Sequence, residues 1–195
     1  ASQRRAPEPG ARLLAVFACQ RAFTDFAHTS KQKSGYGNDH PAAPELEPRE
    51  PTVEDLRDLC RELNRRAASY VVVGGWAMRA AGYNRLTMDV DLLVASDETN
   101  EAKVFSALAT LPDNAVRDLK PGELKQYNVI RVADEIPVNL MCSAAGIDYA
   151  EAARDVVVRE IDSVSIPFAS PRLLYRMKAA THREKDAADL IFLRQ

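Results

Sequence analysis

Cysteine is scarce in this chain of 195 residues, which contains three: Cys19, Cys60 and Cys142. Their odd number and wide spacing argue against a disulfide framework and against the paired ligand spacing of a zinc site. Free thiols are typical of a reducing compartment, so we expect a cytoplasmic protein. Runs of apolar residues long enough to span a bilayer are also missing, and we expect no membrane partner.

An excess of charge of one sign is absent as well. The chain has 26 basic and 28 acidic residues, a net charge of −2, so no general positive field indicates nucleic acid, although a local patch can still bind it. Hydrophobic residues make up 46% and charged residues 28%, the ordinary balance of a globular protein. The length suits one domain with an appendage.

The chain divides by composition near residue 52. Residues 11–27 are compatible with one short helix, and residues 30–51 are rich in glycine, proline, asparagine and charge, as in a linker. We therefore treat residues 1–52 as an N-terminal extension and residues 53–195 as the folded domain.

Strands and helices alternate in that domain, which predicts an α/β (α+β) fold. Thr52 and Asp55 form a capping-box pattern ahead of a helix over 53–68. A hairpin turn is expected at 133–135. The remaining predicted elements are strands at 70–73, 86–94, 127–132 and 136–141, edge strands at 156–158 and 164–166, and helices at 76–81, 101–111 and from Ser170-Pro171 onward.

An acidic pair lies in the predicted strand 86–94. Asp89 and Asp91 alternate with apolar residues, so both side chains project from one face with Cα atoms roughly 6–7 Å apart. That separation allows two carboxylates to ligate one hard cation or a pair of them. For an isolated Asp-x-Asp pattern, a solvated sheet face is the commoner explanation.

A glycine turn upstream favours the functional explanation. Gly74 and Gly75 lie between a predicted strand and a predicted helix, where backbone N–H groups can approach an anion closely. The pattern is neither a P-loop nor a dinucleotide fingerprint. Glycine also serves ordinary strand-to-helix turns, so the turn is informative only in combination with the acidic pair.

In combination, these segments resemble a known signature. The stretch from Tyr70 to Trp76 and the stretch from Gly82 to Leu93, with its Arg-x-Thr-x-Asp-x-Asp form, are similar to the polymerase-β-like nucleotidyltransferase superfamily. Within it, the chain resembles small bacterial proteins related to the toxin component of abortive-infection toxin–antitoxin pairs. The tail from Ser170 to Leu190 matches that group too, so the resemblance covers about residues 53–195.

The resemblance implies a fold, a reaction and partners. The fold is the nucleotidyltransferase fold, a small mixed β-sheet flanked by helices with a C-terminal helix. The reaction moves a nucleoside monophosphate from a nucleoside triphosphate to a hydroxyl of RNA or protein with Mg²⁺, in a toxin-like protein that has a cognate antitoxin. Implied site residues are Asp89 and Asp91 for magnesium, and Gly74, Gly75, Arg85, Lys178 and Lys185 for the nucleotide phosphates.

Simpler roles remain open for the basic residues. Lys178 and Lys185 lie seven apart on one face of a predicted helix, and such a face is commonly just solvated. Arg85 can orient Asp89 or a phosphate, or form a surface salt bridge.

One position departs from the family pattern. Active relatives carry a third carboxylate on a neighbouring strand, where this chain has Asn139 within Pro137–Met141. Asparagine can ligate through its carbonyl but brings no charge and cannot act as a base. Glu135 lies roughly 13 Å along the strand, too far to replace it. The sequence therefore supports two hypotheses: a nucleotidyltransferase with a reduced metal site, or a catalytically impaired module that binds a nucleotide or partner.

Overall fold

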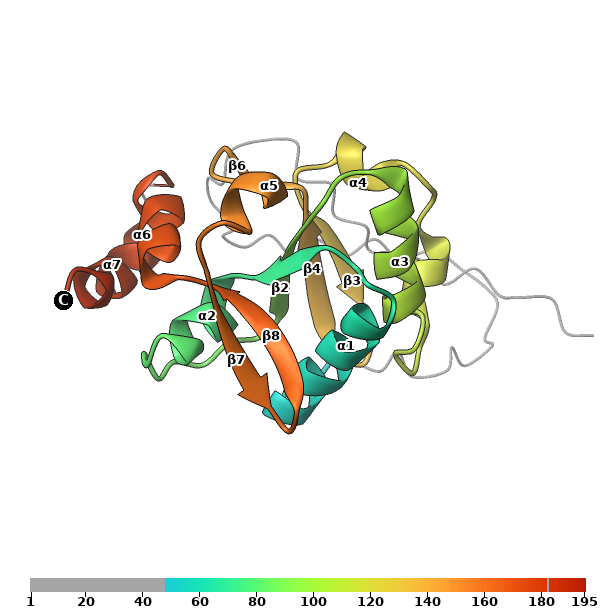
Figure 1. The fold of residues 1–195 in the computed structure, drawn as a ribbon, viewed down its shortest axis with the longest axis horizontal. Helices are drawn as coiled ribbons and strands as arrows, with labels where there is room; N and C mark the ends of the chain where they lie inside the picture. Colours follow the sequence, from blue (N-terminus) through green and yellow to red (C-terminus); the bar gives the residue numbers. More distant parts are fainter. Residues whose placement is uncertain (1–47, 182) are drawn as a thin grey trace, which may run out of the picture.

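A six-stranded mixed sheet forms the centre of the molecule (Figure 1). The structure is a computed structural model that describes residues 48–181 and 183–195, and the helix predicted at 11–27 lies outside this part of the chain. The strands of the sheet are β1 (Tyr70–Val72), β2 (Val90–Val94), β3 (Ile130–Ala133), β4 (Pro137–Met141), β7 (Val156–Ile161) and β8 (Val164–Ala169). Their spatial order is β3-β4-β2-β1-β8-β7.

Two antiparallel hairpins, β3–β4 and β7–β8, form the ends of this sheet. Strands β1 and β2 lie between them, antiparallel to each other; β2 runs parallel to β4, and β1 runs parallel to β8. Strands β5 (Ser143–Ala144) and β6 (Ile147–Asp148) form a small separate ribbon. The predicted α/β class with a mixed sheet is confirmed, and β2 is a central strand with neighbours on both sides.

Helices surround the sheet. They are α1 (Val53–Arg65), α2 (Gly74–Ala80), α3 (Glu98–Leu108), α4 (Glu123–Gln126), α5 (Tyr149–Ala152), α6 (Pro171–Ala179) and α7 (Ala187–Leu193), with 3-10 turns η1 (Ala115–Asp118) and η2 (Glu184–Asp186). Figure 1 shows α6 and α7 together at one end of the molecule. Among the described residues, no helix has the length and apolar character to cross a membrane.

Most local predictions from the sequence are confirmed. The capping box of Thr52 and Asp55 is present at the start of α1, and Ser170 caps α6 through a hydrogen bond from the Leu173 N–H. The hairpin at 133–135 joins β3 to β4. Helix α1 supplies Leu56, Leu59, Cys60 and Leu63 to the core, the spacing that one helical face requires.

Several strand predictions were wrong in extent or in position. The strand predicted over 86–94 begins only at Val90, and the side chains of Leu86 and Met88 are exposed. The hydroxyl of Thr87 donates to the carbonyl of Asp89, which holds the chain in a turn before the strand begins. The strand predicted at 164–166 is not an edge strand, because β8 lies between β1 and β7.

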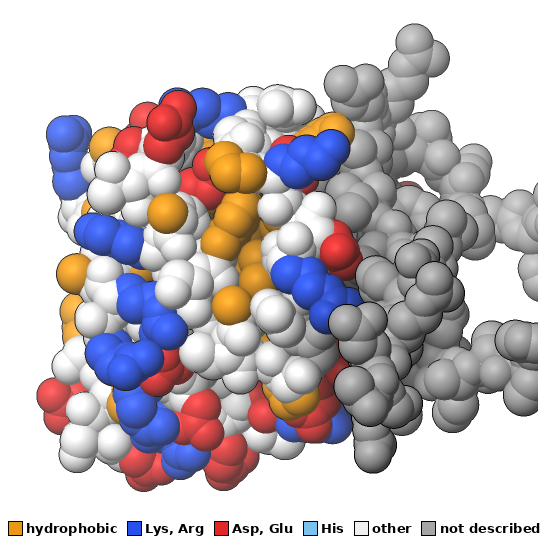
Figure 2. Space-filling view, turned by 90° about the vertical axis from the view of Figure 1, so that its right-hand side faces the viewer, with side chains coloured by type: hydrophobic (Ala, Val, Ile, Leu, Met, Phe, Trp, Pro, Cys, Tyr) orange, Lys and Arg blue, Asp and Glu red, His pale blue; other side chains and the backbone are white. Residues whose placement is uncertain are grey.

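Charges of both signs are interspersed on the face that Figure 2 shows, around a narrow strip of hydrophobic side chains. This mixed distribution agrees with the near-neutral net charge of the sequence. It gives that face no extended field of one sign.

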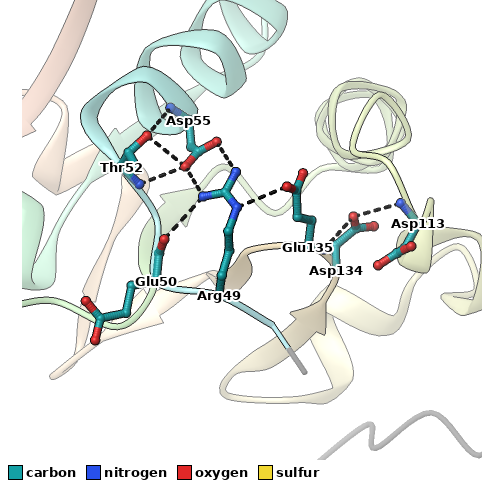
Figure 3. Close-up of polar contacts among 7 residues, drawn as sticks. All are labelled: Arg49, Glu50, Thr52, Asp55, Asp113, Asp134 and Glu135. Atoms are coloured by element: carbon teal, nitrogen blue, oxygen red, sulfur yellow. Dashed lines mark hydrogen bonds and ion pairs between the residues drawn. The ribbon is translucent and has the colours of Figure 1, made fainter. Parts of the chain in front are cut away.

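A cluster around Arg49 fixes the start of the domain (Figure 3). Its guanidinium nitrogens lie 2.5 and 2.8 Å from the two carboxylate oxygens of Asp55, and its Nε lies 3.0 Å from Glu135. The same Asp55 carboxylate accepts from the N–H of Thr52 at 2.7 Å. The hydrogen bond from Arg49 lowers the pKa of Asp55 from 3.8 to about 2. The cluster ties the start of α1 to the β3–β4 turn.

We predict that Asp55→Asn lowers the free energy of unfolding by about 1 kcal/mol at neutral pH. Because the pKa of Asp55 is lower in the folded state, the carboxylate stabilises the fold above its unfolded pKa of 3.8, and this stabilisation is lost as the pH falls toward about 2. The difference between wild type and variant in urea denaturation should therefore shrink below about pH 4. Asp118→Asn, at a weak 4.0 Å ion pair, is the control. A difference that stays constant with pH would contradict the role of the charge.

Candidate active site

The turn from β1 into α2 brings the backbone of Gly74 against the carboxylate of Asp91. A Cβ atom built on Gly74 would lie 1.9 Å from Oδ2 of Asp91, a separation that non-bonded atoms do not tolerate. Gly74 also has a φ of +61°, in the left-handed region that favours glycine. The absence of a side chain at Gly74 is therefore required by both backbone conformation and the space that Asp91 fills.

The second glycine of the turn is equally constrained. A Cβ atom on Gly75 would lie 2.4 Å from the hydroxyl oxygen of Thr87. Thr87 is buried and precedes β2, so it packs the segment before this strand onto the start of α2. The predicted strand and helix are confirmed, but Gly74 and Gly75 form the first turn of α2 instead of a loop before it. That turn contacts the segment that carries the acidic pair.

The acidic pair meets Asn139 on the neighbouring strand. Asp91 is the register partner of Asn139 in the parallel pairing of β2 and β4. The amide nitrogen Nδ2 of Asn139 lies 2.9 Å from Oδ2 of Asp89 and 2.9 Å from Oδ1 of Asp91, donating to both. The structure therefore brings together the three residues that the sequence placed in the candidate site, and it links them by hydrogen bonds.

A further residue, Arg131 on β3, completes this group. Its Nη1 lies 3.2 Å from Oδ2 of Asp89 and 3.4 Å from Oδ1 of Asn139. Sequence reasoning missed Arg131, yet a signal was present. A hairpin centred on Glu135 pairs Arg131 with Asn139, and the structure shows that register.

These residues can hold one divalent cation if the Asn139 amide rotates. Asp89 and Asp91 direct two carboxylate oxygens at a common point, which the Asn139 amide nitrogen now faces. A cation there needs oxygen ligands, so the amide must rotate to present Oδ1. A second cation would need a third carboxylate, and Asn139 does not supply one. Among the described residues, no group of three or more Asp, Glu, His or Cys is arranged to hold a metal.

The predicted phosphate-binding residues Lys178 and Arg85 lie in a separate network. Lys178 is 8% exposed, and its ammonium lies 2.9 Å from Asp186 and 2.7 Å from Asp189. Arg85 contacts the same Asp189 carboxylate at 2.5 Å. Both charges thus have carboxylate partners in this arrangement, and their predicted contact with phosphate stays untested. The prediction that Lys178 and Lys185 share one helix face was wrong, because α6 ends at Ala179 and Lys185 lies in η2. The side chain of Lys185 lies outside the described part of the chain.

Opposing effects act on Asp186 in this network. Burial of its carboxyl raises the pKa, but the hydrogen bond from Lys178 and the charges of Lys178 and Arg183 outweigh burial, so the pKa lies below its usual value. Asp186 is therefore held as a carboxylate. The network joins α6 to η2 and α7, and through Arg85 it reaches the segment that leads to the acidic pair.

Trp76 lies next to the two glycines in α2 and belongs to the hydrophobic core. It is buried and stacks under the guanidinium of Arg79, 4.7 Å from the ring centre. Its indole ring helps to line a hollow of about 250 Å³ between α1, α2, β7 and β8. Its anchoring role is structural.

Comparisons with known proteins found likenesses among solved structures. No protein-family model matches the chain, and no curated protein matches it. Among solved structures, the chain is similar to TM1012 from Thermotoga maritima, described as a candidate nucleotidyltransferase, with a TM-score of 0.48 and 17% identity over 72% of this chain and 90% of that chain. A likeness of this size assigns no activity to the present chain.

We predict that Gly74→Ala lowers the free energy of unfolding by about 2–4 kcal/mol, since the new methyl group must displace Asp91. Gly146→Ala is the matched control, because Gly146 has a φ of +79° but nothing within 4 Å of its Cβ position. The control should lose about 1 kcal/mol from backbone strain alone. Equal losses in urea denaturation would show that the contact with Asp91 is unimportant.

We expect Lys178→Met to lower the free energy of unfolding by about 2–4 kcal/mol, because it removes the buried cation that Asp186 and Asp189 share. Each carboxylate then keeps only its arginine partner, Arg183 for Asp186 and Arg85 for Asp189. The exposed Lys120→Met serves as the control and should be neutral. Chemical denaturation measures both. If Lys178→Met were as stable as wild type but bound triphosphate more weakly, the ammonium would serve the nucleotide instead.

Proposed function

We propose that this chain binds a nucleoside triphosphate beside Gly74 and Gly75 and transfers its nucleoside monophosphate to a hydroxyl acceptor. One observation carries the proposal: the Asp91 carboxylate packs against the Gly74 backbone while Asn139 bridges it to Asp89. An anion-accepting backbone turn and two convergent carboxylates are the two parts that transfer from a triphosphate requires. The sequence resemblance implies the same reaction.

Asp89 and Asp91 are the proposed ligands of a single Mg²⁺. When bound, the cation would neutralise charge on the triphosphate and lower the pKa of the attacking hydroxyl. Asn139 would add its amide oxygen after rotating, because it already lies within 2.9 Å of both carboxylates.

The protein's own contribution is mainly positioning. Gly74 leaves the Asp91 carboxylate in direct contact with the backbone of the turn, so a phosphate held by that backbone lies next to the carboxylate. Thr87 packs on Gly75 and fixes the segment that leads to Asp89. A fixed geometry of this kind lowers the entropic cost of aligning the reacting groups.

For the acceptor we propose a hydroxyl of RNA or protein, in a toxin-like role with a cognate antitoxin, as the resemblance implies. The exposed Leu86 and Met88 belong to the segment between Gly75 and Asp89, so apolar surface is available close to the site in the chain. This surface can contact a base or a protein side chain.

A second candidate function is nucleotide binding without turnover. Arg131 and the Asn139 amide already supply donors to the carboxylates, which reduces the drive to bind a cation. A chain with this arrangement can retain the nucleotide site while losing transfer. The two functions differ in turnover and can be separated directly.

The test is transfer of label from each of four radiolabelled nucleoside triphosphates to RNA and protein pools, with Mg²⁺. Wild type should label an acceptor, and Asp91→Asn should reduce the rate on the order of 100-fold, because it removes half of the acidic pair. Asp118→Asn, a surface aspartate, is the matched control and should retain the rate.

The variant Asn139→Asp distinguishes the candidates. If wild type labels nothing but Asn139→Asp does, the binding module is correct and the enzyme hypothesis is wrong. If neither labels an acceptor nor binds any triphosphate in equilibrium dialysis, both candidates fail.

A further inference from the structure

Three polar side chains form a row across strands β3, β4 and β2. Arg131 is the register partner of Asn139, and Asn139 is the register partner of Asp91. Neighbouring strands are spaced about 4.8 Å apart, so side chains in such a row on one face meet without any further adjustment. The sheet register therefore delivers a guanidinium to the acidic pair.

Arg131 and the two carboxylates together favour one orientation of the Asn139 amide. Its Nη1 donates to Oδ1 of Asn139 at 3.4 Å, which directs Nδ2 toward the two carboxylates at 2.9 Å each. Rotation of the amide would place its N–H groups against the guanidinium, where two donors face each other. Loading a cation between Asp89 and Asp91 thus works against the Arg131 contact.

The net charge of the group also disfavours a second bound cation. Asp89 and Asp91 carry two negative charges, Arg131 returns one positive charge, and Asn139 is neutral. A carboxylate at 139 without Arg131 would give three negative charges, which cannot lie together unless cations compensate. The present set needs less compensation from bound metal.

We infer that Arg131, acting with the Asn139 amide, is a resident cation that replaces the second metal of the candidate site. The inference rests on the proposed function for the purpose of the site, but its test requires no nucleotide and no turnover. The ion pair is more than a surface contact, because the same guanidinium also holds the amide that bridges both aspartates. An isolated surface pair with these exposures would contribute little.

The experiment measures binding of Mn²⁺ alone by electron paramagnetic resonance of the free ion. Wild type should bind one Mn²⁺ weakly. Arg131→Gln combined with Asn139→Asp should bind Mn²⁺ at least about tenfold more tightly, since the first change removes one positive charge from the site and the second adds one negative charge. The matched control, Arg159→Gln with Gln126→Glu, makes the same change of net charge at exposed positions outside the group.

Thermal unfolding provides a second readout, and it is measured for the single variants Asn139→Asp and Arg131→Gln as well as for the double variant. Asn139→Asp should lower Tm in chelator by about 2–4 °C, because it adds a third carboxylate, and Mn²⁺ should restore it. Wild type and the control pair should shift less with Mn²⁺ than the site variants. Arg131→Gln alone keeps the test open if the double variant does not fold.

Two outcomes overturn the inference: wild type binding two Mn²⁺ per chain, or site variants binding and responding to Mn²⁺ no better than the control pair. Failure of the proposed function gives a different result. Triphosphate binding and transfer would then be absent, while the difference in Mn²⁺ affinity between wild type and the site variants would remain.

Discussion

The contact between Asp91 and the bare backbone of Gly74 is the constraint on which the site depends. It is possible only because residue 74 has no Cβ and the chain turns there with a positive φ. The turn ends β1 and begins α2, so the same feature that shapes the chain also places the Gly74 backbone against a carboxylate. Thr87 repeats the arrangement at Gly75, which makes the segment before β2 part of the same packed unit.

Like charges held this close require compensation, and the protein supplies much of it. The Asn139 amide donates to Asp89 and Asp91, and the Arg131 guanidinium donates to Asp89. Buried or half-buried carboxylates are stable only when such donors or a cation meet them. A neutral amide in place of a third carboxylate is therefore a change in how charge is balanced, with direct consequences for how many cations the site can hold.

A second group of charges organises the C-terminal end of the chain. Lys178 joins Asp186 and Asp189, and Arg85 joins Asp189 from the loop before β2. Breaking a buried pair costs several kcal/mol, so this network links the position of α7 to that of the loop. Tyr83 and Phe192 pack together across the same junction, with ring centres 4.8 Å apart. The start of the loop that leads to Thr87 and Asp89 is thereby attached to α7.

The amino-acid sequence by itself determined the local structure: the Thr52 and Asp55 cap, the glycine turn, the β3–β4 hairpin and the shared face of Asp89 and Asp91. These depend on short-range hydrogen bonds and on the two-residue repeat of strands, which the order of residues expresses directly. The start of β2 was misjudged, because the Thr87 hydroxyl donates to the Asp89 carbonyl there. Only the tertiary structure decided that Arg131 meets the acidic pair and that Lys178 meets Asp186 and Asp189. Strand order brings Arg131 to Asp89, 42 positions away in the chain. Helix packing brings Lys178 to Asp186, 8 positions away.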